Sequence, residues 1–149
     1  MSTDGLSVDD GIRTLLLLMP RMVGRAKRLG VPPKLRSLSL APRHLSLLAY
    51  LLFDGPMTVN ELAGRLEVAP ATVSLMVGDL SRKGVLERRE DDADRRRTIV
   101  SIAERHAGPI NEWLGYGAKA WREALSPLTP EQRRMFVDTL LAYERALSG

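Results

Sequence analysis

Residues 57–102 read MTVNELAGRLEVAPATVSLMVGDLSRKGVLERREDDADRRRTIVSI, and their pattern decides the fold. Apolar side chains at helical spacing predict one helix from Thr58 and, after a tight turn at 67–69, a second helix over 70–84. Strand-like runs at 85–90 and 98–102 then predict a β-hairpin around the loop 91–97. The order helix, turn, helix and hairpin is that of a winged helix-turn-helix.

Local signals mark the ends of the two helices. Thr58 followed three residues later by Glu61 is a capping-box pattern, in which each side chain satisfies a backbone N–H group of the other residue. Pro70 suits the first helical position and Gly84 suits a helix stop. The residues expected to face the core from these helices are Leu62, Ala63, Leu66, Val73, Met76, Val77 and Leu80.

The second helix has an outward face of small or uncharged side chains. The residues expected on this face are Ala71, Thr72, Ser74, Leu75 and Gly78. Small side chains allow a helix to approach the major groove of DNA closely, and hydroxyl groups can bond to base edges. An ordinary helical pair inside an all-α domain is the alternative that the pattern leaves open.

The hairpin loop DDADRRR, residues 91–97, places three acids directly before three arginines. Arginines at a hairpin tip suit contact with phosphates or with the minor groove, but they repel one another, and ordering a mobile tip costs affinity. We interpret Asp94 as an internal brace for Arg96 or Arg97 that leaves the neighbouring arginines free. The alternative is a solvated turn, in which each ion pair contributes only about 0–1 kcal/mol.

The stretch resembles the DNA-binding lobe of the multiple antibiotic resistance regulator (MarR) family. The motifs that carry the resemblance are ELA, TVS, an L-x-x-K-G that ends the second helix, and D-R-R followed by alternating apolar residues. The resemblance extends over the flanking helices and so covers nearly the whole chain. It implies a mainly α fold with a small β-hairpin wing, and a homodimer formed by the N- and C-terminal helices. It also implies a repressor of near-palindromic promoter DNA, with a small-molecule pocket between its two lobes.

The resemblance assigns roles to particular residues. Thr72 and Ser74 fall on the recognition helix, and Arg95 and Arg96 fall on the wing, with Asp94 as the acid that orders them. Together with the outward face of the helix, the expected DNA-binding residues are Pro70, Ala71, Thr72, Ser74, Leu75, Arg95, Arg96 and Arg97.

Four positions depart from the family pattern. Leu75 and Asp79 stand where the family usually has basic residues, so fewer phosphate contacts and weaker or less salt-dependent binding are expected. Leu75 has the chemistry to meet a thymine methyl group instead. Ala69 removes a side-chain cap of about 1 kcal/mol before Pro70, and Glu67 occupies a turn position often held by glycine.

The flanking segments predict a helical dimerisation lobe in the same domain. The whole chain, 1–149, is expected to form one domain, with the DNA-binding lobe at about 42–105 and the dimerisation lobe at about 5–30 and 108–148. Helices are expected over 8–29, where Pro20 should kink or interrupt the helix, over about 42–53 with Leu45, Leu48, Leu51 and Leu52 inward, over about 109–125, and from Thr129. The motif TPEQ combines a cap, a first-position proline and a capping-box glutamine.

Composition limits the other functional classes. The 149 residues contain no cysteine and two histidines, so we expect no disulfide, no metal site, no cofactor and a reducing cytoplasm. No nucleophile–base pair or phosphate-binding loop stands out, so an enzyme is the least favoured class. The runner-up is a winged-helix module for protein–protein contacts, which Leu75 and Asp79 would suit.

The net charge of +4 is distributed unevenly. Between Arg21 and Arg43 the chain has several basic residues and no acid, namely Arg21, Arg25, Lys27, Arg28, Lys34, Arg36 and Arg43. Three interpretations stay open: contact with flanking phosphates, an entrance that attracts small, anionic aromatic effectors, or a solvated basic face.

Overall fold

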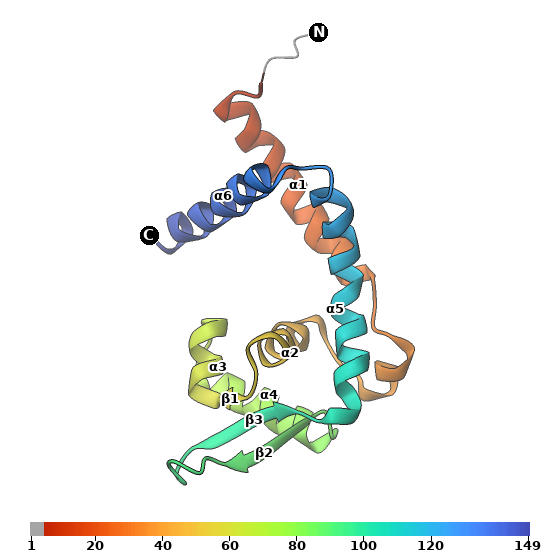
Figure 1. The fold of residues 1–149 in the computed structure, drawn as a ribbon, viewed down its shortest axis with the longest axis vertical. Helices are drawn as coiled ribbons and strands as arrows, with labels where there is room; N and C mark the ends of the chain where they lie inside the picture. Colours follow the sequence, from red (N-terminus) through yellow and green to blue (C-terminus); the bar gives the residue numbers. More distant parts are fainter. Residues whose placement is uncertain (1–4) are drawn as a thin grey trace. The chain divides into compact units, whose positions relative to one another are not determined.

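The computed structural model describes residues 5–149 and divides the chain into two compact units, Met1–Leu114 and Gly115–Gly149. The first unit contains six helical elements and three strands in the order α1 (Val8–Arg28), η1 (Pro33–Leu38), α2 (Pro42–Asp54), β1 (Met57–Thr58), α3 (Val59–Leu66), α4 (Pro70–Arg82), β2 (Leu86–Glu90), β3 (Thr98–Ile102) and the start of α5 (Glu104–Leu125) (Figure 1). The second unit contains the rest of α5 and α6 (Pro130–Ser148). The predicted fold class, mainly α with a small β-hairpin wing, is confirmed.

The β-sheet has three antiparallel strands in the order β1-β3-β2. The hairpin pairs Glu90 with Thr98 next to the loop, and Val100 is paired with Arg88 on one side and Met57 on the other. The sequence predicted the hairpin but not β1, because a two-residue strand is too short to show a period. This short strand joins the start of α3 to the hairpin.

One apolar core joins α2, α3, α4 and the sheet. Its members include Leu47, Leu48, Leu51, Leu62, Ala63, Val73, Val77, Leu80, Val85 and Val100, all buried. The predicted inward positions of α3 and α4 are therefore confirmed, except that Leu66 and Met76 are only half-buried. In α2, Leu45 and Leu52 are half-buried, whereas Leu47 is fully buried.

Neither of the two prolines inside long helices interrupts its helix. The helix α1 runs through Pro20 without interruption, and α5 begins at Glu104, before Pro109 and not at it. A proline removes one backbone donor and strains the preceding turn, but packing can compensate for that loss. In α5 this packing comes from Ile110 and Trp113, which are both buried directly after the proline.

The turns that end α3 and α4 have left-handed backbone conformations. Glu67 has φ 56° and ψ 42° at the end of α3, at the position where the family often has glycine. Gly84 has φ 75° after α4, and a Cβ atom there would lie 2.4 Å from the guanidinium of Arg105, which donates a hydrogen bond to the Gly84 carbonyl (3.1 Å). The α3–α4 turn and the α4–β2 turn therefore fix the orientation of α4 from both ends.

The second unit begins its last helix with the predicted capping box. Gln132 N–H donates to Thr129 Oγ1 (3.1 Å), and Thr129 N–H donates to Gln132 Oε1 (2.9 Å). The rings of Trp121 and Phe136 lie 5.7 Å apart and connect α5 to α6 within this unit. No residue of α6 is buried, and Met135 and Leu147 are 71% and 69% exposed.

The first helix, α1, has a similarly exposed apolar face. Leu16 and Leu17 are 65% and 60% exposed, Ile12 and Leu15 are about half exposed, and none of its residues is buried. Exposed apolar area of this extent on one helix marks a surface that needs a partner. Among residues 5–149, no helix is long and apolar enough to cross a membrane.

Helix α2 begins with a buried histidine. His44 Nδ1 accepts a hydrogen bond from the backbone N–H of Ala41 (2.9 Å), so the neutral ring carries its proton on Nε2. Burial and the nearby positive charges of Arg43 and Lys83 lower the pKa of His44 from its ordinary value of 6.5. The imidazole thus takes the place of the glutamate or glutamine that accepts from the N-cap N–H group in a capping box.

We expect the stability of the protein to fall as the pH is lowered from 6.5 toward the folded-state pKa of His44. Because this pKa is lowered in the folded state, the unfolded chain binds the proton first as the pH falls. The contribution of neutral His44 to the free energy of unfolding is therefore complete only above pH 6.5. Thermal unfolding followed by circular dichroism across this range measures the effect. In H44Q, whose amide oxygen can accept the same hydrogen bond without titrating, this part of the pH dependence should vanish. An unchanged pH profile in H44Q would contradict the assignment.

Candidate nucleic-acid interface

The N-terminal half of α4 presents the face that the sequence predicted to be outward. Ala71, Thr72, Ser74 and Leu75 are exposed, and Gly78 is half-buried. Leu75 is 75% exposed, although it lies in the middle of a helix that packs against the core. The helix begins at Pro70, and Ala69 provides no side-chain cap, as expected.

The negative charge of Asp79 in α4 is offset by basic residues that follow it in the chain. The Asp79 carboxylate lies 3.2 Å from Lys83 Nζ and 3.9 Å from the Arg82 guanidinium, one turn toward the end of α4. Lys83 Nζ also donates to the Ser39 carbonyl (3.4 Å), which holds it at that end of the helix. The charge of Asp79 is therefore offset close to where it arises, and the first turns of α4 remain without charge.

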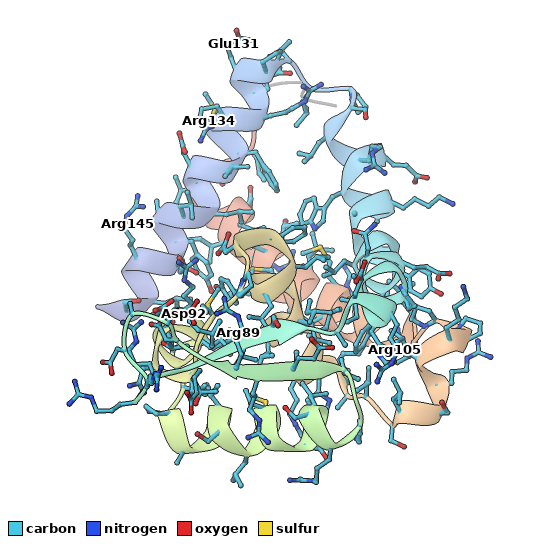
Figure 2. The ribbon with its side chains drawn as sticks, turned by 60° about the horizontal axis from the view of Figure 1, so that its bottom comes forward. Arg89, Asp92, Arg105, Glu131, Arg134 and Arg145 are labelled. Atoms are coloured by element: carbon cyan, nitrogen blue, oxygen red, sulfur yellow. The ribbon has the colours of Figure 1, made fainter. Side chains whose placement is uncertain are left out.

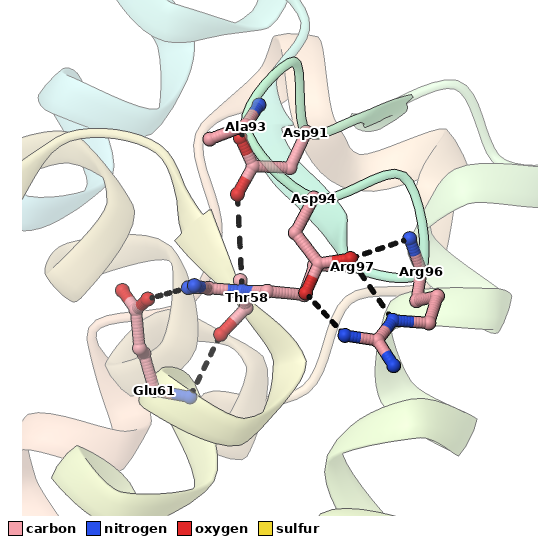
Figure 3. A network of polar contacts seen from close by, with 7 residues as sticks. All are labelled: Thr58, Glu61, Asp91, Ala93, Asp94, Arg96 and Arg97. Atoms are coloured by element: carbon pink, nitrogen blue, oxygen red, sulfur yellow. Dashed lines mark hydrogen bonds and ion pairs between the residues drawn. The ribbon is translucent and has the colours of Figure 1, made fainter.

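The wing loop is closed by its own backbone. Asp91 N–H donates to the Arg97 carbonyl (3.0 Å), and Arg97 N–H donates to the Asp94 carbonyl (2.9 Å). Side chains add further bonds, because Asp91 Oδ1 accepts from the Ala93 N–H (3.0 Å). These local bonds to carboxylates are typical of tight turns and reduce the number of conformations that the loop can adopt (Figure 3).

Asp94 binds Arg96 in three ways. Its Oδ1 accepts from the backbone N–H of Arg96 (3.1 Å) and from Nε of the same residue (3.2 Å), and its Oδ2 lies 3.4 Å from Nη2 (Figure 3). These bonds, the side-chain bond first, lower the pKa of Asp94 below its ordinary value of 3.8. The sequence offered Arg96 or Arg97 as the partner of Asp94, and in the structure the side-chain partner is Arg96. The guanidinium is held yet stays 91% exposed.

Arg97 is held by different acids. Its Nη2 donates to Glu61 Oε1 on α3 (2.8 Å), and its Nε lies 3.8 Å from Asp91 Oδ2 (Figure 3). Glu61 was predicted to complete a capping box with Thr58. Only half of that box is present: Thr58 Oγ1 accepts from the Glu61 N–H (3.2 Å), while the Glu61 carboxylate binds the wing. The prediction failed because Arg97 is far away in the sequence and a charged partner outcompetes a neutral N–H group.

Arg95 is the wing arginine that remains unengaged. Within residues 5–149 it has no hydrogen bond or ion pair, whereas Arg96 and Arg97 each have one or more. The structure thus brings together one free guanidinium and two that are held in place, on a loop of seven residues. These arginines, like the exposed residues of α4, stay predicted DNA contacts.

A groove lies between the wing and the starts of α3 and α4. It has a volume of about 510 Å³, and its walls include Thr58, Asn60, Glu61, Pro70, Ala71, Ser74, Arg96 and Arg97. A second hollow of about 450 Å³ follows along the hairpin, with Ser74 again on one side and Arg88 and Arg89 of β2 on the other (Figure 2 labels Arg89). Ser74 therefore faces the wing, while Leu75 lies beside these grooves without lining either of them.

Arg88 and Arg89 were missed as candidate contacts. In β2 the two arginines stand between Glu87 and Glu90, and this balanced charge concealed them in the sequence. The signal that could have revealed them is their position in the hairpin next to the loop arginines, since a wing presents its strand as well as its tip.

The acid-free stretch from Arg21 to Arg43 does not form a single site. Lys27 lines an apolar cavity of about 280 Å³ together with Val23, Ala26, Gly30, Val31, Pro42, Leu45 and Trp113. Arg36 Nε instead bonds to the Val31 carbonyl at 3.4 Å, outside the lining of this cavity. No cluster of three or more metal-ligating side chains occurs within the described part of the chain, residues 5–149.

We predict that the carboxyl carbon of Asp94 titrates below 3.8 in an NMR experiment. The R96A substitution should move this pKa back up, because it removes the side-chain bond that favours the charged carboxylate. The order that Asp94 gives the wing is then present above pH 3.8 and is lost only as the pH falls through the lowered pKa. R145A, which removes an exposed arginine of α6, is the matched control and should leave the titration unchanged. An Asp94 pKa that does not respond to R96A would contradict the brace.

The comparisons with known proteins agree with this geometry. A sequence model of the MarR family matches residues 38–97, which span the helices α2 to α4 and the wing loop. Among solved structures, the S. aureus MepR–DNA complex superposes with a TM-score of 0.66 at 19% identity, covering 95% of this chain and 99% of that chain. The PcaV transcriptional regulator of Streptomyces coelicolor, in complex with its natural ligand, gives 0.66 at 17% identity, covering 99% of both chains. At these identities the two structures establish the fold alone.

A curated relative extends the match in sequence. The HTH-type transcriptional repressor MdtR of Bacillus subtilis is 30% identical over 115 residues, which cover 77% of this chain and 68% of the relative. The match therefore reaches beyond the lobe that the family model covers. The chain belongs to the MarR family of DNA-binding transcription regulators.

Proposed function

We propose that this protein is a homodimeric repressor that binds near-palindromic promoter DNA and is released by a small-molecule effector. The observation that carries the proposal is the uncharged, exposed start of α4 next to a wing whose arginines are held by carboxylates. The first surface suits the base edges of a major groove, and the second suits phosphates and the minor groove. The cytoplasm, where promoter DNA lies in a bacterium, is the compartment in which this activity would operate.

The wing and the start of α4 are proposed to make different contributions to DNA binding. Arg95, Arg96 and Arg97 supply the positive charge that attracts DNA, because Pro70 to Asp79 contains no basic residue. Thr72 and Ser74 supply hydroxyl groups for base or phosphate contacts, and Ala71 permits close approach of the helix. Arg88 and Arg89 line the hollow between the hairpin and α4 and are proposed to add phosphate contacts.

The dimer is proposed from the exposed apolar faces of α1 and α6. Each helix contains no buried residue, yet each carries several leucines or other large apolar side chains that are at least 39% exposed. A second copy of the chain would cover these faces in a symmetric interface. In such a dimer two recognition helices meet half-sites about one DNA turn, roughly 34–36 Å, apart.

The cavity beside Trp113 is the proposed effector site. Its walls are mostly apolar, and Lys27 is the one charged residue in its lining. A small aromatic acid would bury its ring against the apolar walls and place its carboxylate near the ammonium group. The cavity touches α1, α2 and α5, so a ligand could bias the position of α2, and of the lobe built on it, relative to α1.

We expect R95A/R96A to lose binding to its operator fragment. The substitutions remove two cationic contacts per chain, so the slope of log K against log salt should flatten by about 0.9 for each phosphate that is no longer neutralised. Fluorescence anisotropy over a salt series measures both quantities. The double variant R122A/R145A removes the same charge from exposed positions outside the wing and should retain binding. Full binding by R95A/R96A would favour the winged-helix module for protein contacts instead.

We expect I12E/L16E to be monomeric in sedimentation velocity experiments while the natural chain is a dimer. These residues lie one helical turn apart on α1 and are 49% and 65% exposed, so the charges should not unfold the helix but should be costly in an apolar interface. V68E, which alters an exposed apolar residue of the α3–α4 turn, is the control and should remain a dimer. A dimer that tolerates both glutamates would place the interface elsewhere.

A further inference from the structure

We propose that Leu75 is a specificity-determining residue that contacts the 5-methyl group of thymine in the major groove, so that the operator has a thymine at that position in each half-site. This inference rests on the proposed function, because it concerns how the same helix chooses its DNA sequence. It adds a particular base and a particular atom to that function, and it can fail while DNA binding itself holds.

The first support is the exposure of Leu75. It is the most exposed large apolar side chain of the DNA-binding lobe, with 75% of its surface free, although the helix on either side of it is firmly packed. Val73 and Val77, two positions before and after it, are buried at 0% and 1%. Leu75 therefore points away from the core and is not part of the packing that orients α4.

The second support is the small size of its neighbours. The residues one turn away on the same helical face are Ala71 and Thr72 before it and Gly78 and Asp79 after it, and three of these four are small and uncharged. With small neighbours, the leucine stands above the helix surface and would be the first side chain of that face to meet another molecule. A helix that enters a major groove makes its base contacts with side chains in this position.

The third support is the absence of the usual cationic readers. From Pro70 to Asp79 there is no lysine or arginine, so the common bidentate contact of arginine with guanine is not open to this part of α4. Asp79 is paired with Lys83, which competes with a cytosine amino group for its carboxylate. Of the four bases, only thymine presents a methyl group in the major groove, and an exposed leucine is a partner for that group.

Charge decides between DNA and a protein as the occupant of this face. Ser74, the residue before Leu75, lines one groove with Arg96 and Arg97 of the wing. Asp94 and Glu61 hold these two arginines in place, and Arg95 has no partner within residues 5–149. An ordered set of guanidinium groups beside an apolar contact matches a phosphate backbone beside a base edge. A protein partner would have to supply acids opposite the same arginines, and this becomes an outcome of the test.

The experiment compares thymine with uracil, which differ only by the methyl group. The intergenic fragment upstream of the protein's own gene is amplified once with dTTP and once with dUTP, and binding of both duplexes is measured by anisotropy. For the natural protein we expect the uracil duplex to bind about fourfold more weakly per contacted methyl group, hence about 16-fold for two half-sites. L75A should bind the thymine duplex more weakly and should not distinguish the two duplexes.

Two further variants serve as controls. V68A shortens another exposed apolar residue, outside the helix, and should keep the full thymine preference. L75M keeps an apolar side chain of similar reach and should keep most of it. Since Leu75 is not part of the core, none of these variants should unfold the lobe, and circular dichroism checks this.

The outcomes distinguish a failure of the role of Leu75 from a failure of the proposed function. One outcome is that the natural protein prefers its own fragment over a scrambled duplex and yet binds the thymine and uracil forms of that fragment equally. This result, or a thymine preference that L75A retains, would overturn the role of Leu75 and leave the proposed function intact. Failure of the natural protein to prefer the thymine fragment over a scrambled duplex would contradict the proposed function, and the role of Leu75 with it. Binding of a protein partner that L75A abolishes, without DNA selectivity, would likewise contradict both.

Discussion

The pairing of carboxylates with guanidinium groups at the hairpin tip is the constraint on which the proposed interface depends. Three consecutive arginines repel one another, and a free loop that carried them would have to be ordered when it bound. Backbone ordering costs about 1–2 kcal/mol per residue. The exposed ion pairs Asp94–Arg96 and Glu61–Arg97 contribute little to global stability, because solvent screens their charges. Their effect is to fix the loop before binding, so that less of this entropy is lost on DNA.

Glu61 connects the wing loop to helix α3. It belongs to the first turn of α3, whose start is capped by Thr58 and joined to the sheet through β1. The bond from Arg97 therefore connects the wing to the helix that braces α4. We interpret the wing and the recognition helix as one rigid body, in which a displacement of one surface carries the other with it. An effector that acts through α2 would move both surfaces together.

Sequence reasoning was accurate where the signal is local. The 3.6-residue period located α3 and α4 and their buried faces, and the motif at Thr129 located the capping box of α6. It failed where a contact joins distant segments: Glu61 and Arg97 are separated in sequence by 36 residues, and no local pattern connects them. Similarly, β1 exists only through its pairing with β3, and the burial of His44 depends on the tertiary core around α2. Pro109 was given too much weight as a helix start, since the packing of Ile110 outweighs one missing hydrogen bond in α5.

The proposed mode of binding separates attraction from selection on this lobe. The arginines of the wing and β2 supply charge that does not depend on sequence, while the first turns of α4 offer hydroxyl and apolar groups only. The pairing of Asp79 with Lys83 removes the one acid that would oppose a phosphate at that helix. The proposed division explains how a helix without a cation in its first turns can belong to a DNA-binding protein: the wing would hold the duplex, and the helix would read it.

The most direct test of this division is the affinity of the natural protein for DNA from its own upstream region, measured by fluorescence anisotropy against a scrambled duplex of the same composition over a salt series. We expect the natural fragment to be bound well above the scrambled one at every salt concentration, with both affinities falling as salt rises. Equal affinity for the two duplexes would contradict the division, because the wing would then hold DNA that the helix does not read.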